Sequence, residues 1–192
     1  MLTLILLALV AVTVGGGVAV ERLTRQPRGV KRILAARTRP IGEADDTGDV
    51  RIEGVVEVFE GTLTAPLTGR RCVYFEHVVR ADGSQDLDGA IVRVADGVPF
   101  VVRDASGRAI VDPTGATALL TTLGVDGGEQ VLCAGDRVVV IGRGVREPDP
   151  DASTVTGTYR DGPATRLRMS HTPQFPLHLV APDRARRIAP AS

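Results

Sequence analysis

The chain has 192 residues, and its 23 basic and 23 acidic side chains give a formal net charge of zero at pH 7. This balance gives no reason to expect nucleic acid as a partner. Aromatic residues make up 3 % of the chain and Trp is absent, so any folded core must be aliphatic. The length suits one domain behind an N-terminal extension.

The first twenty-one residues predict a transmembrane anchor. Residues 2–20 read LTLILLALVAVTVGGGVAV and contain no charge. As a helix this run is about 28 Å long, close to the thickness of bilayer hydrocarbon. A cleaved secretory signal is the alternative, because small residues at Gly15, Gly16, Gly17 and Ala19 would suit a peptidase. No positive charge precedes the apolar run, however, and that favours the anchor.

Residues 22–40 form a basic juxtamembrane segment. Positive charges that follow a span are retained on the cytoplasmic side, which predicts the N-terminus outside and the folded domain in the cytoplasm. A short helix on anionic lipid headgroups and a solvated linker both fit this segment. The predicted membrane-surface residues are Arg22, Arg25, Arg28, Lys31 and Arg32.

Residues 41–180 carry the pattern of a β domain. Apolar and polar residues alternate over residues 49–59, as in a strand with one buried face. Similar short runs, punctuated by Gly, Asp and Pro, predict strands at 72–79, 90–94, 100–104, 108–111, 130–133, 137–142, 165–169 and 177–180. The predicted fold is mostly β, a small antiparallel β-barrel, with an OB-like arrangement as one candidate.

Turn and loop residues separate these strands. Residues 104–107 (DASG) predict a hairpin turn, and residues 146–153 (REPDPDAS) predict an exposed loop. Residues 116–123 suit either a helical turn or a strand. The Pro- and Ala-rich residues 181–192 predict a disordered tail.

No reaction centre stands out in this domain. His77, His171 and His178 lack the spacing of a zinc site, and we expect neither metal nor cofactor. Strict alternation places His77 and Cys72 on opposite faces of one strand, which disfavours a Cys–His nucleophile pair. Cys72 and Cys133 are most simply buried small hydrophobes, and a single disulfide, which would need an oxidising compartment, is the alternative.

Three segments resemble one family in the right order. They are residues 62–75 (TLTAPLTGRRCVYF), residues 98–114 (VPFVVRDASGRAIVDPT) and residues 134–142 (AGDRVVVIG). Together they are similar to the Pro-Leu-x-Gly turn with its Cys-Val-Tyr strand, the Asp-x-x-Gly hairpin and the Gly-Asp-x-Val strand of the GIDE, or mulan-type, family. The resemblance covers roughly residues 30–180 and implies that family's BAM (beside-a-membrane) domain.

The resemblance does not carry an activity across. Eukaryotic members of that family are membrane-embedded E3 ubiquitin ligases, and their activity resides in a RING finger behind a second span. Two Cys and three His cannot supply the eight zinc ligands of a RING. Ubiquitin transfer is therefore the alternative function, distinguishable by zinc content. The family topology also places the BAM domain away from the cytosol, opposite to the orientation that the arginines predict.

The sequence thus predicts a membrane-anchored module that binds or scaffolds a partner protein at the bilayer surface, and it favours a non-enzymatic role. Pro66 and Gly69 suit a tight turn, because Pro fixes φ and Gly permits positive φ. A binding groove around this turn is the functional hypothesis. Its candidate partner-binding residues are Pro66, Leu67, Gly69, Arg71 and Tyr74.

Overall fold

A computed structural model describes residues 37–44, 49–80, 91–120, 122–123, 128–150 and 164–188. In chain order the elements are η1 (Ile41–Glu43), β1 (Asp49–Val58), β2 (Leu63–Thr64), β3 (Arg71–Cys72), β4 (Tyr74–Arg80), β5 (Ile91–Gly97), β6 (Phe100–Arg103), β7 (Arg108–Asp112), β8 (Thr117–Leu119), β9 (Thr122–Leu123), β10 (Glu129–Leu132), β11 (Arg137–Pro148), β12 (Thr165–Ser170), β13 (His178–Val180) and α2 (Pro182–Ile188).

The predicted anchor and its flanking cations lie outside the described residues, and so does the juxtamembrane segment up to residue 36. Among the helices that the structure does describe, none combines the length and the apolar character needed to cross a bilayer.

Five strands close into a barrel, in the order β1-β6-β7-β12-β11, with β11 pairing back onto β1. This confirms the predicted mostly-β barrel. Four of the five pairings are antiparallel, but β7 and β12 run parallel, so the prediction of a wholly antiparallel barrel is wrong. The long connection between these two strands gives the chain room to return in the same direction. Strands β13 and β8, themselves a parallel pair, extend the sheet beyond β11.

Alternation along β1 explains how the barrel fills its interior. Val50, Ile52 and Val56 are buried in the main core cluster. Gly54 takes the position between Ile52 and Val56 in this series, where a Cβ would collide with the carbonyl oxygen of Arg103 on β6. The missing side chain lets β1 approach β6 closely enough for the barrel to close.

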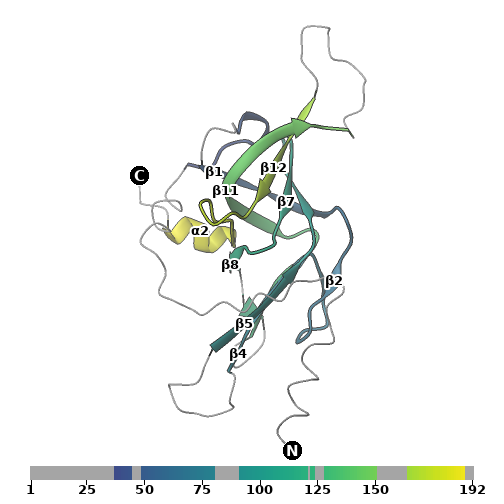
Figure 1. Cartoon of the computed structure of the whole chain (residues 1–192), viewed down its shortest axis with the longest axis vertical. Coiled ribbons are helices and arrows are strands. Elements are labelled where there is room, and N and C mark those ends of the chain that lie inside the picture. Colours follow the sequence, from purple (N-terminus) through teal and green to yellow (C-terminus); the bar gives the residue numbers. More distant parts are fainter. Residues whose placement is uncertain are drawn as a thin grey trace, which may run out of the picture.

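A second, smaller sheet stands against the barrel. It has the strand order β5-β4-β10-β9, and Figure 1 shows β4 and β5 projecting below the barrel. The two-stranded hairpin β2–β3 completes this region. We call the four-stranded sheet and its hairpin the annex. One face of its sheet packs on the barrel core, and residues of the other face share a cluster with the hairpin.

A β-bulge joins the hairpin to the sheet at Val73. The amide of Val73 donates to the carbonyl oxygen of Leu132 (2.8 Å), and Tyr74 also pairs with Leu132. Two residues of one strand therefore oppose one residue of the other. Val73 and Tyr74 both enter the barrel-side core, whereas Cys72 joins Phe75 in the opposite cluster. The prediction that Cys72 and His77 lie on opposite faces is thus wrong: His77 stacks on Phe75, in whose cluster Cys72 lies, because alternation fails at a bulge.

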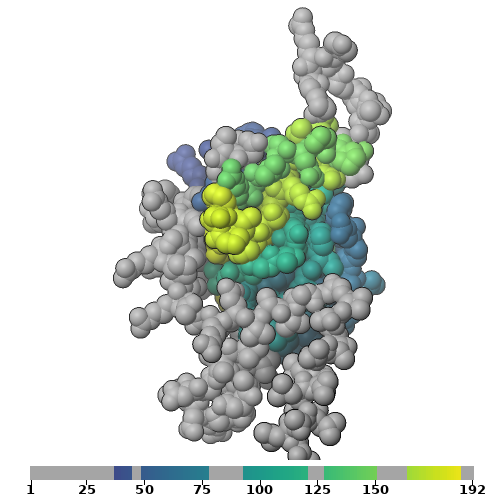
Figure 2. Space-filling model, viewed as in Figure 1, coloured from purple at the N-terminus to yellow at the C-terminus, as the bar shows by residue number. Residues whose placement is uncertain are grey.

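Two further predictions need correction. The tail predicted to be disordered forms α2 over residues 182–188, with Ala185 buried at 1 % exposure against β11. Figure 2 shows this yellow helix lying on the green part of the chain, and the blue residues around β2 at the opposite margin. The loop predicted from residue 146 starts later, because β11 continues to Pro148. The ambiguous residues 116–123 contain the short strands β8 and β9.

Candidate partner-binding surface

The turn between β2 and β3, residues 65–70, is the element that the sequence motif predicted. Gly69 has a φ of +67°, a conformation that L-residues rarely adopt. Two backbone hydrogen bonds close the loop: Gly69 N–H donates to the carbonyl of Ala65 (2.9 Å), and Ala65 N–H donates to the carbonyl of Arg70 (2.9 Å). The predicted role of Gly69 as a turn residue is therefore met. We call this segment the β2–β3 turn.

A buried carboxylate fixes the tip of the β2–β3 turn. Glu129, on β10, has 0 % exposure. It accepts hydrogen bonds from Leu67 N–H (3.2 Å), Thr68 N–H (3.0 Å) and the Thr68 hydroxyl (2.7 Å). A carboxylate removed from water is costly unless donors replace its hydration, and these three donors do so. The turn is consequently held in one conformation by a residue 61 positions further along the chain.

This anchoring presents apolar surface to solvent. Leu67 is 63 % exposed although its own amide is bound to Glu129. Pro66, Gly69 and Arg71 are exposed beside it, and the Arg71 guanidinium donates to the Thr62 hydroxyl (3.0 Å). Four of the five predicted partner-binding residues therefore lie together on one exposed element.

Tyr74, the fifth predicted residue, is separate from this surface. It is 1 % exposed, and its hydroxyl donates to Oε2 of Glu76 (2.9 Å). Burial, followed by the charge of Glu76, raises the pKa of the Tyr74 hydroxyl well above its usual range. The Arg93 guanidinium donates to Glu76 (2.6 Å) and to the carbonyl of Ala116 (2.9 Å). Tyr74 thus belongs to a buried polar network that ties the annex to the segment before β8.

Behind the turn lies a cluster of side chains that carry reactive groups. Nδ1 of His77 is 3.9 Å from Oε1 of Glu129, and the His77 ring stacks on Phe75 with a centroid separation of 6.2 Å. Burial raises the pKa of the Cys72 thiol to about 11 and also raises that of Cys133. Both thiols are therefore mostly protonated at neutral pH, which disfavours a role as a catalytic nucleophile and makes any thiol exchange slow. Within the described ranges, no three His, Cys, Asp or Glu side chains are placed to hold a metal ion.

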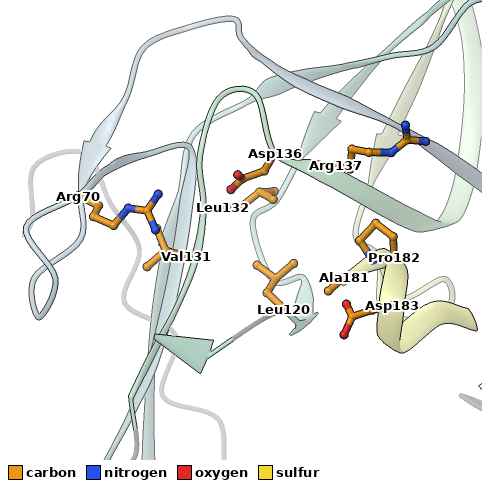
Figure 3. Close-up of a pocket in the computed structure, with 9 residues that line it drawn as sticks. All are labelled: Arg70, Leu120, Val131, Leu132, Asp136, Arg137, Ala181, Pro182 and Asp183. Atoms are coloured by element: carbon orange, nitrogen blue, oxygen red, sulfur yellow. The ribbon is translucent and has the colours of Figure 1, made fainter. Parts of the chain in front are cut away.

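A pocket of about 240 Å³ opens between the annex and the start of α2 (Figure 3). Arg70 of the β2–β3 turn lines one end and Asp183 of α2 lines the other, as Figure 3 shows. The remaining lining residues are Leu120, Val131, Leu132, Asp136, Arg137, Ala181 and Pro182. Four of the nine lining residues are charged and the other five are apolar, so the pocket has a mixed polar and apolar lining.

The other two histidines lie elsewhere. Nδ1 of His171 accepts a hydrogen bond from Leu177 N–H (3.4 Å). His178, on β13, is 3 % exposed, and neither of its ring nitrogens has a hydrogen-bond partner among the described residues. Burial, reinforced by nearby His171, lowers the pKa of His178, so the ring is neutral in the folded chain at pH 7.

The sequence motif pointed to the turn but not to the residue that fixes it. Glu129 was not predicted, although it shares one face of β10 with Val131 and Cys133. An acidic residue in phase with apolar ones on a short strand was the available indication. The pocket could not be predicted, because its residues come from five separate segments. The predicted membrane-surface cations lie outside the described residues.

No family model, curated protein or solved structure matches this chain. The candidate surface therefore rests on the residues described above.

Proposed function

We propose that this chain is a membrane-anchored binding module whose β2–β3 turn and adjoining pocket contact a partner protein at the bilayer surface. The supporting observation is the exposure of Leu67 on a turn that is fixed by the buried Glu129. Covering an exposed leucine with a partner removes apolar surface from water, which is favourable. Because the turn is already fixed, binding costs little conformational entropy.

The pocket extends this surface. Arg70 belongs both to the β2–β3 turn and to the lining of the pocket, so one partner segment could contact the turn and the pocket together. The charged side chains of the lining would orient the partner, and its apolar residues would add buried contact area.

Membrane attachment is the second part of the proposal. The uncharged residues 2–20 would form the anchor, and the following arginines would keep the domain on the cytoplasmic side, against anionic lipid. Attachment would raise the effective concentration of the module for membrane partners. The closed five-strand barrel with a single parallel pair favours an OB-like type, and the three quoted sequence segments favour a BAM-like domain.

Co-purification from solubilised membranes tests this proposal. Leu67→Asp should remove the protein that co-purifies with the full chain, because a charge would have to be buried in the interface. Val145→Asp is the matched control, since Val145 is 55 % exposed on the barrel strand β11. Loss of the partner with Val145→Asp alone, or with neither variant, would contradict the assignment of the β2–β3 turn.

A further inference from the structure

The β-bulge at Val73 has a consequence for the two cysteines. Beyond a bulge the pairing of two strands is shifted by one residue. Because Val73 and Tyr74 both oppose Leu132, the register places the next residue back along the chain, Cys72, opposite the next residue forward, Cys133. Without the bulge, Cys133 would oppose Val73. The shift therefore brings together two residues that strict alternation places on different faces.

The expected spacing suits a covalent bond. Val73 N–H is bonded to Leu132 O, so the adjacent position is a non-hydrogen-bonded pair, in which opposite Cα atoms are about 4.5 Å apart and side chains are closest. Disulfides span Cα separations of about 4.4–6.8 Å. The separation expected for the pair is thus within disulfide range.

The side chains also share one environment. Both cysteines belong to the cluster formed by Ala65, Phe75 and Val131, and both are free thiols, without a disulfide, in this structure. They are near enough for a negative charge on Cys133 to raise the pKa of Cys72. A bond between them would fasten the hairpin that carries Leu67 to the strand that carries Glu129.

We propose that Cys72 and Cys133 form a reversible intramolecular disulfide that fastens the β2–β3 hairpin to β10. The reaction needs a disulfide co-reactant such as oxidised glutathione. The thiolate of one cysteine attacks a sulfur of this co-reactant and releases one glutathione thiolate. The second cysteine then attacks the mixed disulfide and releases the other glutathione. The protein loses two protons and two electrons, and the co-reactant gains them as two thiols.

The environment of the pair predicts slow exchange. Thiol–disulfide exchange requires a thiolate, and burial disfavours this form for both cysteines. Oxidation should therefore become faster when a higher pH favours the thiolate. It should also become faster when denaturant opens the fold and exposes the buried thiols. In a reducing compartment the pair rests as two thiols, whereas sustained oxidation would convert it to the disulfide.

Equilibration of the full chain in detergent micelles with reduced and oxidised glutathione tests this proposal. After acid quenching, the denatured chain is alkylated and its intact mass is measured. We expect one transition, from a chain with two alkylated thiols to a monomer that takes up no alkylating reagent and has lost two hydrogens. Mixed glutathione adducts, intermolecular dimers or two persistent free thiols at the oxidising end would overturn the proposal.

A relocated cysteine provides the matched control. The double variant Cys133→Ala, Val131→Cys keeps two cysteines and leaves the relocated one in the same cluster, but residue 131 opposes Phe75. Its distance from Cys72 grows to that of a diagonal pair, about 7–8 Å between Cα atoms, beyond disulfide range. This variant should keep two free thiols or form mixed adducts under the conditions that oxidise the wild type. Equal intramolecular oxidation of both chains would show that the opposed pairing is not the cause.

Discussion

The barrel and the annex differ in what they bury. Inner positions of the barrel hold aliphatic and aromatic side chains such as Ile52, Phe100 and Val140, each at 0 % exposure. Its ion pairs differ in exposure: both partners of Arg103–Glu57 are about half exposed, whereas Arg108–Asp149 is largely shielded from solvent. The annex buries carboxylates, with Glu76 at 6 % and Glu129 at 0 % exposure, whereas the barrel strand β1 buries the guanidinium residue Arg51, at 7 %.

This contrast separates scaffold from site. In an apolar interior closed by continuous strand pairing, the backbone groups that need hydrogen-bond partners find them in the neighbouring strands. Buried carboxylates, in contrast, cost free energy unless they organise donors around them. In the annex, Glu129 organises the β2–β3 turn and Glu76 organises the contact between annex and barrel. We therefore interpret the barrel as the rigid base on which the annex presents its turn.

Truncation in the barrel should have the largest effect and should affect the whole domain. Phe100→Ala removes a fully buried ring from β6 and should lower the free energy of unfolding by about 3–5 kcal/mol. Chemical denaturation, followed with one spectroscopic probe in the barrel and another in the annex, would measure this decrease. We expect both regions to lose stability together. If the annex alone loosened, the barrel would not be the base of the structure.

Removal of the buried carboxylate should have a smaller and local effect. Glu129→Ala leaves two amides and one hydroxyl of the β2–β3 turn without their acceptor, at a cost of about 1–3 kcal/mol. Hydrogen exchange should become faster at Leu67 and Thr68 while barrel amides keep their protection. The control Glu57→Ala removes an exposed ion pair and should change the stability by about 0.5 kcal/mol or less. Unchanged exchange at Leu67 would contradict the anchoring role of Glu129.

Acidification should lower the free energy of unfolding, because His178 is buried in its neutral form. Burial lowers its pKa, so below about pH 6.5 the unfolded chain binds a proton that the folded chain does not. The contribution of the neutral ring is complete above that pH and is lost as the pH falls toward the lowered folded value. The free energy of unfolding should therefore decrease over this window, and His178→Leu should flatten the decrease. An identical pH profile in wild type and variant would rule out His178 as its source.

Substitution of Leu67, the proposed contact residue, should have the smallest effect on stability. Leu67→Asp changes an exposed side chain whose backbone bond to Glu129 is retained, so thermal unfolding should shift by the equivalent of about 0.5 kcal/mol or less. A much larger loss would show that Leu67 supports the fold, and the argument for a binding role would fail.

Local patterns predicted the strands of the barrel well. Alternation found β1 over residues 49–58, and the DASG turn placed β6 and β7 on either side of it, where the two strands pair as a hairpin. The parallel pairing of β7 with β12 was missed, because local periodicity carries no information on which distant strands meet. The helix α2 was missed as well, since it has only seven residues and the buried residue described in it is a small one, Ala185.

The candidate site was predicted in part. Pro66 and Gly69 identified a turn from their backbone preferences alone. The bulge at Val73 escaped prediction, and with it the true faces of Tyr74 and Cys72, because one extra residue in a strand leaves the composition unchanged. Glu129 was missed because its role depends on a turn some sixty positions away.

Site-specific photo-crosslinking tests the central claim most directly. A photoreactive residue is placed at Leu67 in one full chain and at Val145 in another, and native membranes are irradiated. Both positions are exposed, but only Leu67 belongs to the annex. We predict a discrete protein adduct from position 67 and none from position 145. No adduct from position 67, or the same adduct from both positions, would contradict the assignment of the β2–β3 turn as the partner-binding element.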